Sequence, residues 1–208
     1  MNSSTSSRKW LFFCIGLIVG IFLMIALPLA VLASGMMNMS AATPAGKIES
    51  TIAPWAFDRS MDRHAKKAEN PFAGNAKAVG YGLEHYKDNC AVCHGAPGLK
   101  PSDIGEGLNP PPPDLWSDDS QELSDGEMFW IVKNGIRMTG MPAFGKSHSD
   151  EMIWHMVTFV RHMPKITDAE RDQIREVIGE EEEHLNAGAG EISASAPASS
   201  STQPTSAP

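Results

Sequence analysis

The pentapeptide Cys90-Ala91-Val92-Cys93-His94 lies near the middle of this 208-residue chain, and the rest of the sequence is interpreted outward from it. Two cysteines with two residues between them occur in redox dithiols, in half-sites for zinc and at sites of covalent haem attachment. The histidine that directly follows the second cysteine favours haem attachment. Two thiols at this spacing reach the two vinyl groups of the porphyrin, and the next side chain reaches the iron from the same loop.

The two other kinds of site with this spacing find little support elsewhere in the chain. A structural zinc site requires further soft ligands, but the third cysteine, Cys14, lies inside an apolar stretch. A thioredoxin-like dithiol is expected in a βαβ unit, and no segment alternates convincingly at period two. We therefore predict one covalent haem c, attached through Cys90 and Cys93, with His94 as an iron ligand.

Residues 95–122, which follow the motif, are rich in glycine and proline, and Pro110 to Pro113 are consecutive. Consecutive prolines lack backbone donors, so we expect neither a regular helix nor a strand in this stretch. A loop of this length in a compact domain usually has a function or encloses something. We expect a carbonyl from the proline run, with Pro112 and Pro113 as candidates, to accept a hydrogen bond from Nδ1 of His94. That bond leaves Nε2 for iron.

The second iron ligand is expected in the sequence Gly140-Met141-Pro142-Ala143-Phe144-Gly145, where glycine and proline expose a methionine on a tight loop. We predict Met141 as this ligand. Met138 is a rival, and three further methionines fall on or at the end of a predicted helix, where methionine is usually a core residue; these are Met152, Met156 and Met163. Histidine is the alternative ligand type. His148 is expected near a helix cap and His155 on a helix surface, and we expect the others to be solvated: His64, His85, His162 and His184.

Helical patterns surround these motifs. Val79, Gly82, Leu83 and Tyr86 recur at i, i+3, i+4 and i+7, which predicts one helix face that ends at Cys90. Three more helices are predicted from caps and stops: one from the Ser124/Glu127 capping box to Gly135, one from about Asp150 to Met163 after a cap at Ser147 or Ser149, and one opened by Thr167 with Glu170. The fold class is therefore all-α.

The N-terminal region predicts a membrane anchor. Residues 10–33 carry no charge, and a spanning helix needs about 20 apolar residues, whereas a signal peptide has an apolar core of about 7–15. Cleavage after Val31-Leu32-Ala33 is the alternative to an uncleaved anchor. Arg8 and Lys9 precede the apolar stretch, so the positive-inside rule keeps the N-terminus in the cytoplasm and exports the rest.

Charge composition bears on partners. The net charge of −8 argues against binding of nucleic acid, which requires a basic face. Eight carboxylates and no lysine or arginine lie between Asp103 and Glu127. We expect this acidic segment to lie near a haem edge and to meet a partner with a basic patch, the alternative being a solvated loop.

With these motifs the chain resembles the monohaem bacterial branch of the class I c-type cytochromes. The resemblance rests on Tyr-x-x-x-Cys-x-x-Cys-His-Gly (86–95), Asn-Pro-Pro-Pro-Pro-Asp-Leu (109–115) and Gly-Met-Pro-Ala-Phe-Gly (140–145), and it covers roughly residues 72–165. It implies a small cytochrome c fold around one His/Met-ligated haem. It also implies that the first helix of the domain crosses the last through a small residue and an aromatic residue, positions held here by Gly82 and Phe159.

The predicted organisation has six segments. They are a cytoplasmic N-terminus (1–9), a transmembrane signal anchor (10–34), a linker with one short helix (35–70), a cytochrome c domain (71–166), an acidic C-terminal helix (167–186) and a disordered tail (187–208). Within the linker, Trp55, Phe57 and Met61 are the residues that would dock a helix onto the domain or onto a partner.

The function expected from these features is electron transfer rather than catalysis. Two protein ligands fill both axial positions of the iron, which leaves no site for substrate or oxygen, and a thioether ligand favours ferrous iron. The predicted protein is a single-pass protein of a bacterial inner membrane with its haem domain in the periplasm, and its expected redox partners are a quinol-oxidising complex and a terminal oxidase. The alternatives are a cytochrome subunit of a larger respiratory or dehydrogenase complex and, less favoured, a haem enzyme or gas sensor.

Overall fold

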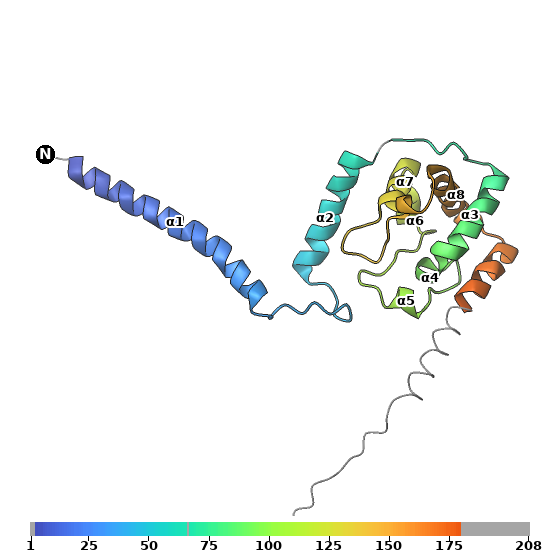
Figure 1. Ribbon diagram of the computed structural model, residues 1–208, viewed down its shortest axis with the longest axis horizontal. Coiled ribbons are helices and arrows are strands. Elements are labelled where there is room, and N and C mark those ends of the chain that lie inside the picture. The colour runs from blue at the N-terminus through green and yellow to red at the C-terminus, as the bar shows by residue number, and fades with distance from the viewer. Residues whose placement is uncertain (1–2, 66, 180–208) are drawn as a thin grey trace, which may run out of the picture. The chain divides into compact units, whose positions relative to one another are not determined.

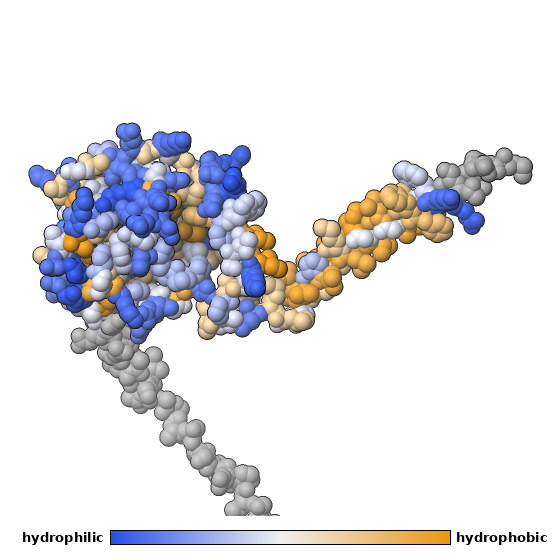
Figure 2. Space-filling model, turned by 180° about the vertical axis from the view of Figure 1, so that it is seen from behind, coloured by the Kyte–Doolittle hydropathy of each residue, from blue (hydrophilic) through white to orange (hydrophobic). Residues whose placement is uncertain are grey.

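The structure is a computed structural model that describes residues 3–65 and 67–179, and it divides into two compact units at Thr43 and Pro44 (Figure 1). The first unit contains α1 (Ser3–Ala33). Within the described residues, Arg8–Ala33 is the one helical stretch long and apolar enough to cross a membrane. Figure 2 shows a nearly continuous hydrophobic surface along this helix. Such a helix has the length and composition of the predicted anchor.

The second unit begins with α2 (Lys47–His64), which is longer than the one short helix expected in the linker. Met61 is buried, Phe57 is half-buried and Trp55 is exposed, so only part of the predicted apolar set packs inward. The C-terminal end of α2 also contacts the domain through His64, whose ring stacks on Trp130 at 6.4 Å between centroids. Helix α2 thus contacts the rest of the domain mainly through the residues near its C-terminus.

The remaining elements form the helical body of the domain, and the described residues contain no β-strand, which agrees with the predicted all-α class. In chain order they are α3 (Ala76–Asn89), α4 (Ala91–His94), α5 (Asp103–Glu106), α6 (Asp118–Glu122), α7 (Asp125–Asn134), the 3₁₀ turn Phe144–Lys146, α8 (Asp150–His162), the 3₁₀ turn Met163–Lys165 and a helix whose described part covers residues 168–179.

The centre of the domain is the crossing of α3 and α8, and Gly82 permits their close approach. A Cβ atom placed on Gly82 would lie 2.1 Å from the carbonyl oxygen of His155 and 2.7 Å from Cβ of Phe159. One turn along α3, the fully buried ring of Tyr86 packs on Phe159 at 5.2 Å between centroids. The crossing residues implied by the resemblance are therefore the ones in contact.

The helix starts follow the predicted caps. Ser124 and Glu127 form a reciprocal capping box at α7, and Thr167 and Glu170 make the same contacts at the start of the last helix. At α8 the cap is Ser149 rather than Ser147, because the Ser149 side chain accepts from the backbone N–H of Met152. Ile174 and Ile178 are buried, so the last helix packs onto the core. The predicted disordered tail, residues 187–208, lies outside the described residues.

The expectation that residues 95–122 contain no regular helix was wrong in part. The proline run itself is irregular, but α5 and α6 form on either side of it. Each short helix follows a serine, Ser102 or Ser117, and the side chain of Ser117 accepts from the N–H of Ser120. At α6 the Ser117 side chain thus satisfies a backbone donor that is otherwise unpaired at a helix start, which favours a turn beside the prolines, whereas Ser102 makes no side-chain cap bond at α5.

Candidate haem site

The two cysteines and the histidine of the motif are held by a single helical turn. Cys90 ends α3 and precedes α4, and its carbonyl oxygen accepts from the N–H groups of Cys93 at 3.1 Å and of His94 at 2.9 Å. Burial raises the pKa of the Cys90 thiol to about 12 and also raises the pKa of Cys93. Burial therefore favours the neutral form of both thiols, and one short turn holds all three residues close together.

Hydrogen bonds and close packing from neighbouring segments hold this turn in place. The hydroxyl of Tyr86 donates to the carbonyl oxygen of Gly95 at 2.6 Å, and Ser102 donates to that of Val92 through Oγ at 2.9 Å and through its N–H at 3.0 Å. A Cβ atom on Gly105 would lie 2.9 Å from Cα of Cys93. The backbone of α5 therefore approaches Cys93 so closely that a side chain at Gly105 would not fit.

The imidazole of His94 is oriented by the proline run. Its Nδ1 lies 2.9 Å from the carbonyl oxygen of Pro113, the second of the two candidate prolines, while Pro112 is half-buried. Burial lowers the pKa of His94, and the bond to Pro113 acts in the opposite direction. A neutral ring that donates from Nδ1 keeps the lone pair on Nε2, which is the atom required for metal ligation.

Met141 lies on a loop that closes on itself. The N–H of Ile136 donates to the carbonyl oxygen of Met141 at 3.2 Å, and the N–H of Met141 donates to Oγ1 of Thr139 at 3.1 Å. A Cβ atom on Gly135, whose φ is +66°, would lie 2.7 Å from that same carbonyl oxygen. Met141 is half-buried. The loop therefore presents this thioether on a backbone that glycine alone can form.

The rival methionines sit in different surroundings. Met156 and Met163 are fully buried among core side chains, and Met152 is half-buried on α8. Met138, in contrast, is 87% exposed. Of the four predicted rivals, then, two are packed in the core, one is half-buried on a helix and one is exposed to solvent.

These donors fit haem c. A neutral imidazole with a free Nε2 and a thioether are the ligand types of a His/Met haem, and a thiol pair at the Cys-x-x-Cys spacing is the type that attaches one. Residues 78–160 match the model of the family described as cytochrome C oxidase, cbb3-type, subunit III. This segment is a cytochrome c domain. The match covers about two fifths of the chain, and a comparison with curated proteins finds no match.

One histidine of the cytochrome c domain is buried against expectation. His155, predicted on a helix surface, is 8% exposed, with ring centroids 4.6 Å from Phe72 and 5.4 Å from Tyr81. The cause is a long-range contact that the helical pattern does not contain. The segment before α3 folds over α8, where Asn70 Nδ2 donates to Thr158 Oγ1 at 2.9 Å.

His162 and His85 also make contacts that the sequence did not indicate. His162, expected to be solvated, lies 3.1 Å from a carboxylate oxygen of Glu170, because the last helix packs back against the end of α8. His85, also expected to be solvated, is half-buried, with its ring centroid 5.7 Å from that of His148. His64 is exposed as predicted, and His184 lies outside the described residues.

Three of the eight carboxylates in the acidic segment of the cytochrome c domain are engaged within the fold. Asp125 pairs with Arg161 at 2.6 Å, Glu106 lies 3.5 Å from Lys100, and Glu127 accepts from Ser124. The other five are exposed: Asp103, Asp114, Asp118, Asp119 and Glu122. The number of freely exposed carboxylates is therefore smaller than the sequence count suggests, and three of them, Asp118, Asp119 and Glu122, lie on α6.

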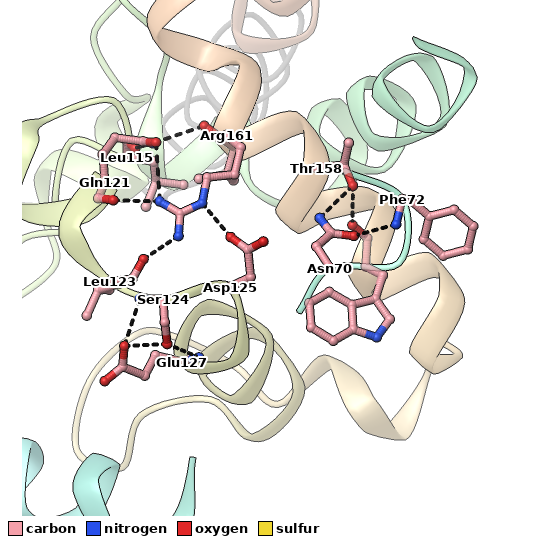
Figure 3. Close-up of polar contacts among 12 residues, drawn as sticks. Asn70, Phe72, Leu115, Gln121, Leu123, Ser124, Asp125, Glu127, Thr158 and Arg161 are labelled. Carbon is pink, nitrogen blue, oxygen red and sulfur yellow. Dashed lines mark hydrogen bonds and ion pairs between the residues drawn. The ribbon is translucent and has the colours of Figure 1, made fainter. Parts of the chain in front are cut away.

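Sequence reasoning missed two residues that organise the loop next to the site. Gln121 and Arg161 bond to backbone carbonyls around α6, as Figure 3 shows. Arg161 offered a usable signal, because it is a charged residue directly after Phe159 and Val160 on a helix with an apolar face. Gln121 offered none, since a glutamine in a polar stretch is usually solvated.

Proposed function

We propose that this protein is a membrane-tethered electron carrier with one covalent haem c, attached to Cys90 and Cys93 and ligated by His94 and Met141. The observation that carries the proposal is the bond from His94 Nδ1 to the Pro113 carbonyl, because it prepares Nε2 as a ligand within one turn of two thiols at the attachment spacing. The cytochrome c domain supports the broader role of an electron-transfer haem protein.

The proposal assigns no catalytic role, because two side chains of the protein would ligate the iron and leave no position for a substrate. When bound, the haem supplies a one-electron iron couple. His94 and Met141 would be the two protein ligands of its iron, and the Pro113 carbonyl holds the imidazole in the tautomer that this requires. The loop that carries Met141 is fixed by Thr139 and by the close approach at Gly135. The thioether ligand favours the reduced state and so raises the potential.

The proposed location is the periplasmic face of a bacterial inner membrane, with α1 as a single-pass anchor. Arg8 and Lys9 precede the apolar stretch of α1, and no charged residue follows it until Lys47. Under the positive-inside rule, this asymmetry keeps the N-terminus in the cytoplasm. The cytochrome c domain is then exported to the compartment in which haem c is attached.

The test is haem staining of the full chain, expressed in a bacterium that matures c-type cytochromes. Haem should stay with the denatured polypeptide, in the membrane fraction, and the double change Cys90→Ala/Cys93→Ala should remove it. Cys14→Ala is the matched control and should retain full staining, since Cys14 lies on α1. Wild-type haem that is extracted by acidified acetone would contradict covalent attachment, and wild-type staining in the soluble fraction would contradict the anchor.

A second candidate, a cytochrome subunit of a larger respiratory or dehydrogenase complex, is favoured by the description of the matched family, which names an oxidase subunit. The same haem site serves both functions, so the assembly state separates them. Mild-detergent purification of the native membrane protein would yield a stable complex of fixed stoichiometry for a subunit and this chain alone for a free carrier.

The exposed carboxylates around α6 predict how the redox partner is recognised. Opposite charge raises encounter rates, and salt screens it. With its native partner, whether a quinol-oxidising complex or a terminal oxidase, the second-order electron-transfer rate should fall about tenfold or more between low and physiological ionic strength. The triple change Asp118→Asn/Asp119→Asn/Glu122→Gln should flatten this dependence, as measured by stopped-flow absorbance.

The matched control alters the same number of exposed carboxylates at a different place, through Glu49→Gln/Asp58→Asn/Glu69→Gln. This variant should keep the wild-type salt dependence, because these residues lie on or just after α2. A wild-type rate that is insensitive to salt, or that rises with salt, would leave the solvated-loop interpretation of the acidic segment.

A further inference from the structure

Three consecutive carbonyl groups begin at the last residue of the proline run, and each accepts a hydrogen bond. The carbonyl of Pro113 accepts from His94, as described above. The carbonyl of Asp114 accepts from Oγ of Ser117 at 2.7 Å and from Oγ of Ser120 at 2.8 Å. The carbonyl of Leu115 accepts from Nε2 of Gln121 at 2.7 Å. The backbone direction at Pro113 is thus fixed by donors from α6 and its cap on the next two residues.

Gln121 joins this loop to α8. Its side-chain amide nitrogen carries two protons, and the second contact runs from Nε2 to the carbonyl oxygen of Val160 at 3.0 Å. Val160 lies near the C-terminal end of α8, and its carbonyl oxygen also accepts from the backbone N–H of Met163, which caps the helix. One side chain therefore uses both donors to connect the loop of Leu115 to this helix.

Arg161, the next residue on α8, holds Gln121 in place. Its Nη1 donates to the backbone carbonyl of Gln121 at 2.6 Å, its Nη2 donates to that of Leu123, and its Nε pairs with Asp125 at 2.6 Å (Figure 3). All three contacts come from one guanidinium group, whose planar geometry fixes their directions. The segment from Gln121 to Asp125 is thereby attached to α8 at several points.

The same helix also holds the other side of the site. α8 packs against α3 at Gly82 and Phe159, and α3 ends at Cys90. Helix α8 therefore positions both partners of the hydrogen bond. It positions the His94 side chain through α3, and it positions the Pro113 carbonyl through Gln121.

Resting on the proposed haem function, we propose that Gln121, held by Arg161, is a positioning residue for His94. It fixes the Pro113 carbonyl opposite Nδ1 through the rigid segment Pro113–Leu115, and so sets the strength of the bond that orients the imidazole. A stronger acceptor bond at Nδ1 makes the imidazole a better electron donor at Nε2. Gln121 then influences the redox potential although its contacts are to backbone groups.

The test variant is Gln121→Met, which keeps the length of the side chain and removes both donors. In the full-length, reduced holoprotein in detergent, nitrogen-15 NMR should show the His94 Nδ1–H exchanging with solvent about tenfold faster than in the wild type, as expected when about one hydrogen bond of stabilisation is lost. The midpoint potential should rise, because an imidazole that donates less electron density stabilises the ferric state less.

The matched control is Thr158→Val, which removes a buried hydrogen bond from the same helix but touches Asn70 and Trp154 rather than the loop. It should lower the melting temperature while leaving the exchange rate and the potential at their wild-type values. Ser120→Ala, which removes one of the donors to Asp114, is a milder second variant and should accelerate exchange about threefold even where Gln121→Met fails to accumulate.

The outcomes separate this proposal from the proposed function. A wild-type protein without covalent haem contradicts the proposed function itself. A loaded wild type whose Gln121→Met and Ser120→Ala variants keep the wild-type exchange rate and potential contradicts only the positioning role. Equal acceleration in Thr158→Val also overturns it, because the effect would then reflect general loosening of α8.

Discussion

Replacing Met141 by alanine is expected to abolish the red-region absorption band that arises from charge transfer between a methionine sulfur and ferric iron. The midpoint potential should fall by on the order of 0.1–0.2 V, a fraction of the ~0.8 V over which axial ligands set haem potentials. The physical reason is the loss of the thioether, which stabilises the ferrous state. Optical spectroscopy and redox titration of the oxidised domain measure both effects.

Met138→Ala is the control for this result. Met138 lies three residues away on the same loop and is 87% exposed, so its removal should leave the band and the potential unchanged. Loss of the band in Met138→Ala, with retention in Met141→Ala, would reassign the ligand. Because the two changes remove the same side chain from one loop, a general effect of loop disruption would appear in both.

The second large effect is expected at Gly82. A Cβ atom at this position would overlap the backbone of His155 and the Cβ of Phe159, and neither group can move away without displacing α8. Gly82→Ala should therefore lower the free energy of unfolding by about 3 kcal/mol, at the upper end of overpacking costs, and Gly82→Leu should lower it further. Thermal denaturation followed at the haem and by far-ultraviolet circular dichroism gives the measurement.

Gly80→Ala provides a control with the opposite sign. Gly80 lies two residues earlier on α3, it is exposed, and no atom lies within 4 Å of the position its Cβ would take. Alanine is the better helix former, so this change should stabilise the protein by about 0.5–1 kcal/mol. Similar destabilisation at both positions would contradict the importance of the α3–α8 crossing.

The features that sequence predicted well are those encoded locally. The capping box of Ser124 and Glu127 involves residues three apart, and the buried face of α3 follows from helical spacing alone. The Cys-x-x-Cys-His motif is likewise contiguous, and its three side chains lie on one turn. The choice of Pro113 over Pro112 was not readable, because it depends on where donors on α6 hold the following backbone.

Contacts between distant segments account for the differences. His155 lies on a helix whose sequence pattern does not indicate that another segment packs over it. It is buried by Phe72 and Tyr81, which come from a distant part of the sequence. The role of Arg161 depends on carbonyl groups about forty residues away. Such partners are selected by the packed fold rather than by the local pattern, so a single sequence does not indicate them.

The docked end of α2 shortens the connection between the cytochrome c domain and the proposed membrane anchor. Met61 is buried and His64 stacks on Trp130, so α2 moves with the domain, and residues 34–46 remain as the connection to the proposed anchor. As a flexible coil, such a segment spans about 20 Å, against about 33 Å for the full stretch from 35 to 70. With the proposed anchor in a membrane, the volume searched by the domain is then about four- to fivefold smaller, and its effective concentration toward partners in the same membrane is higher by the same factor.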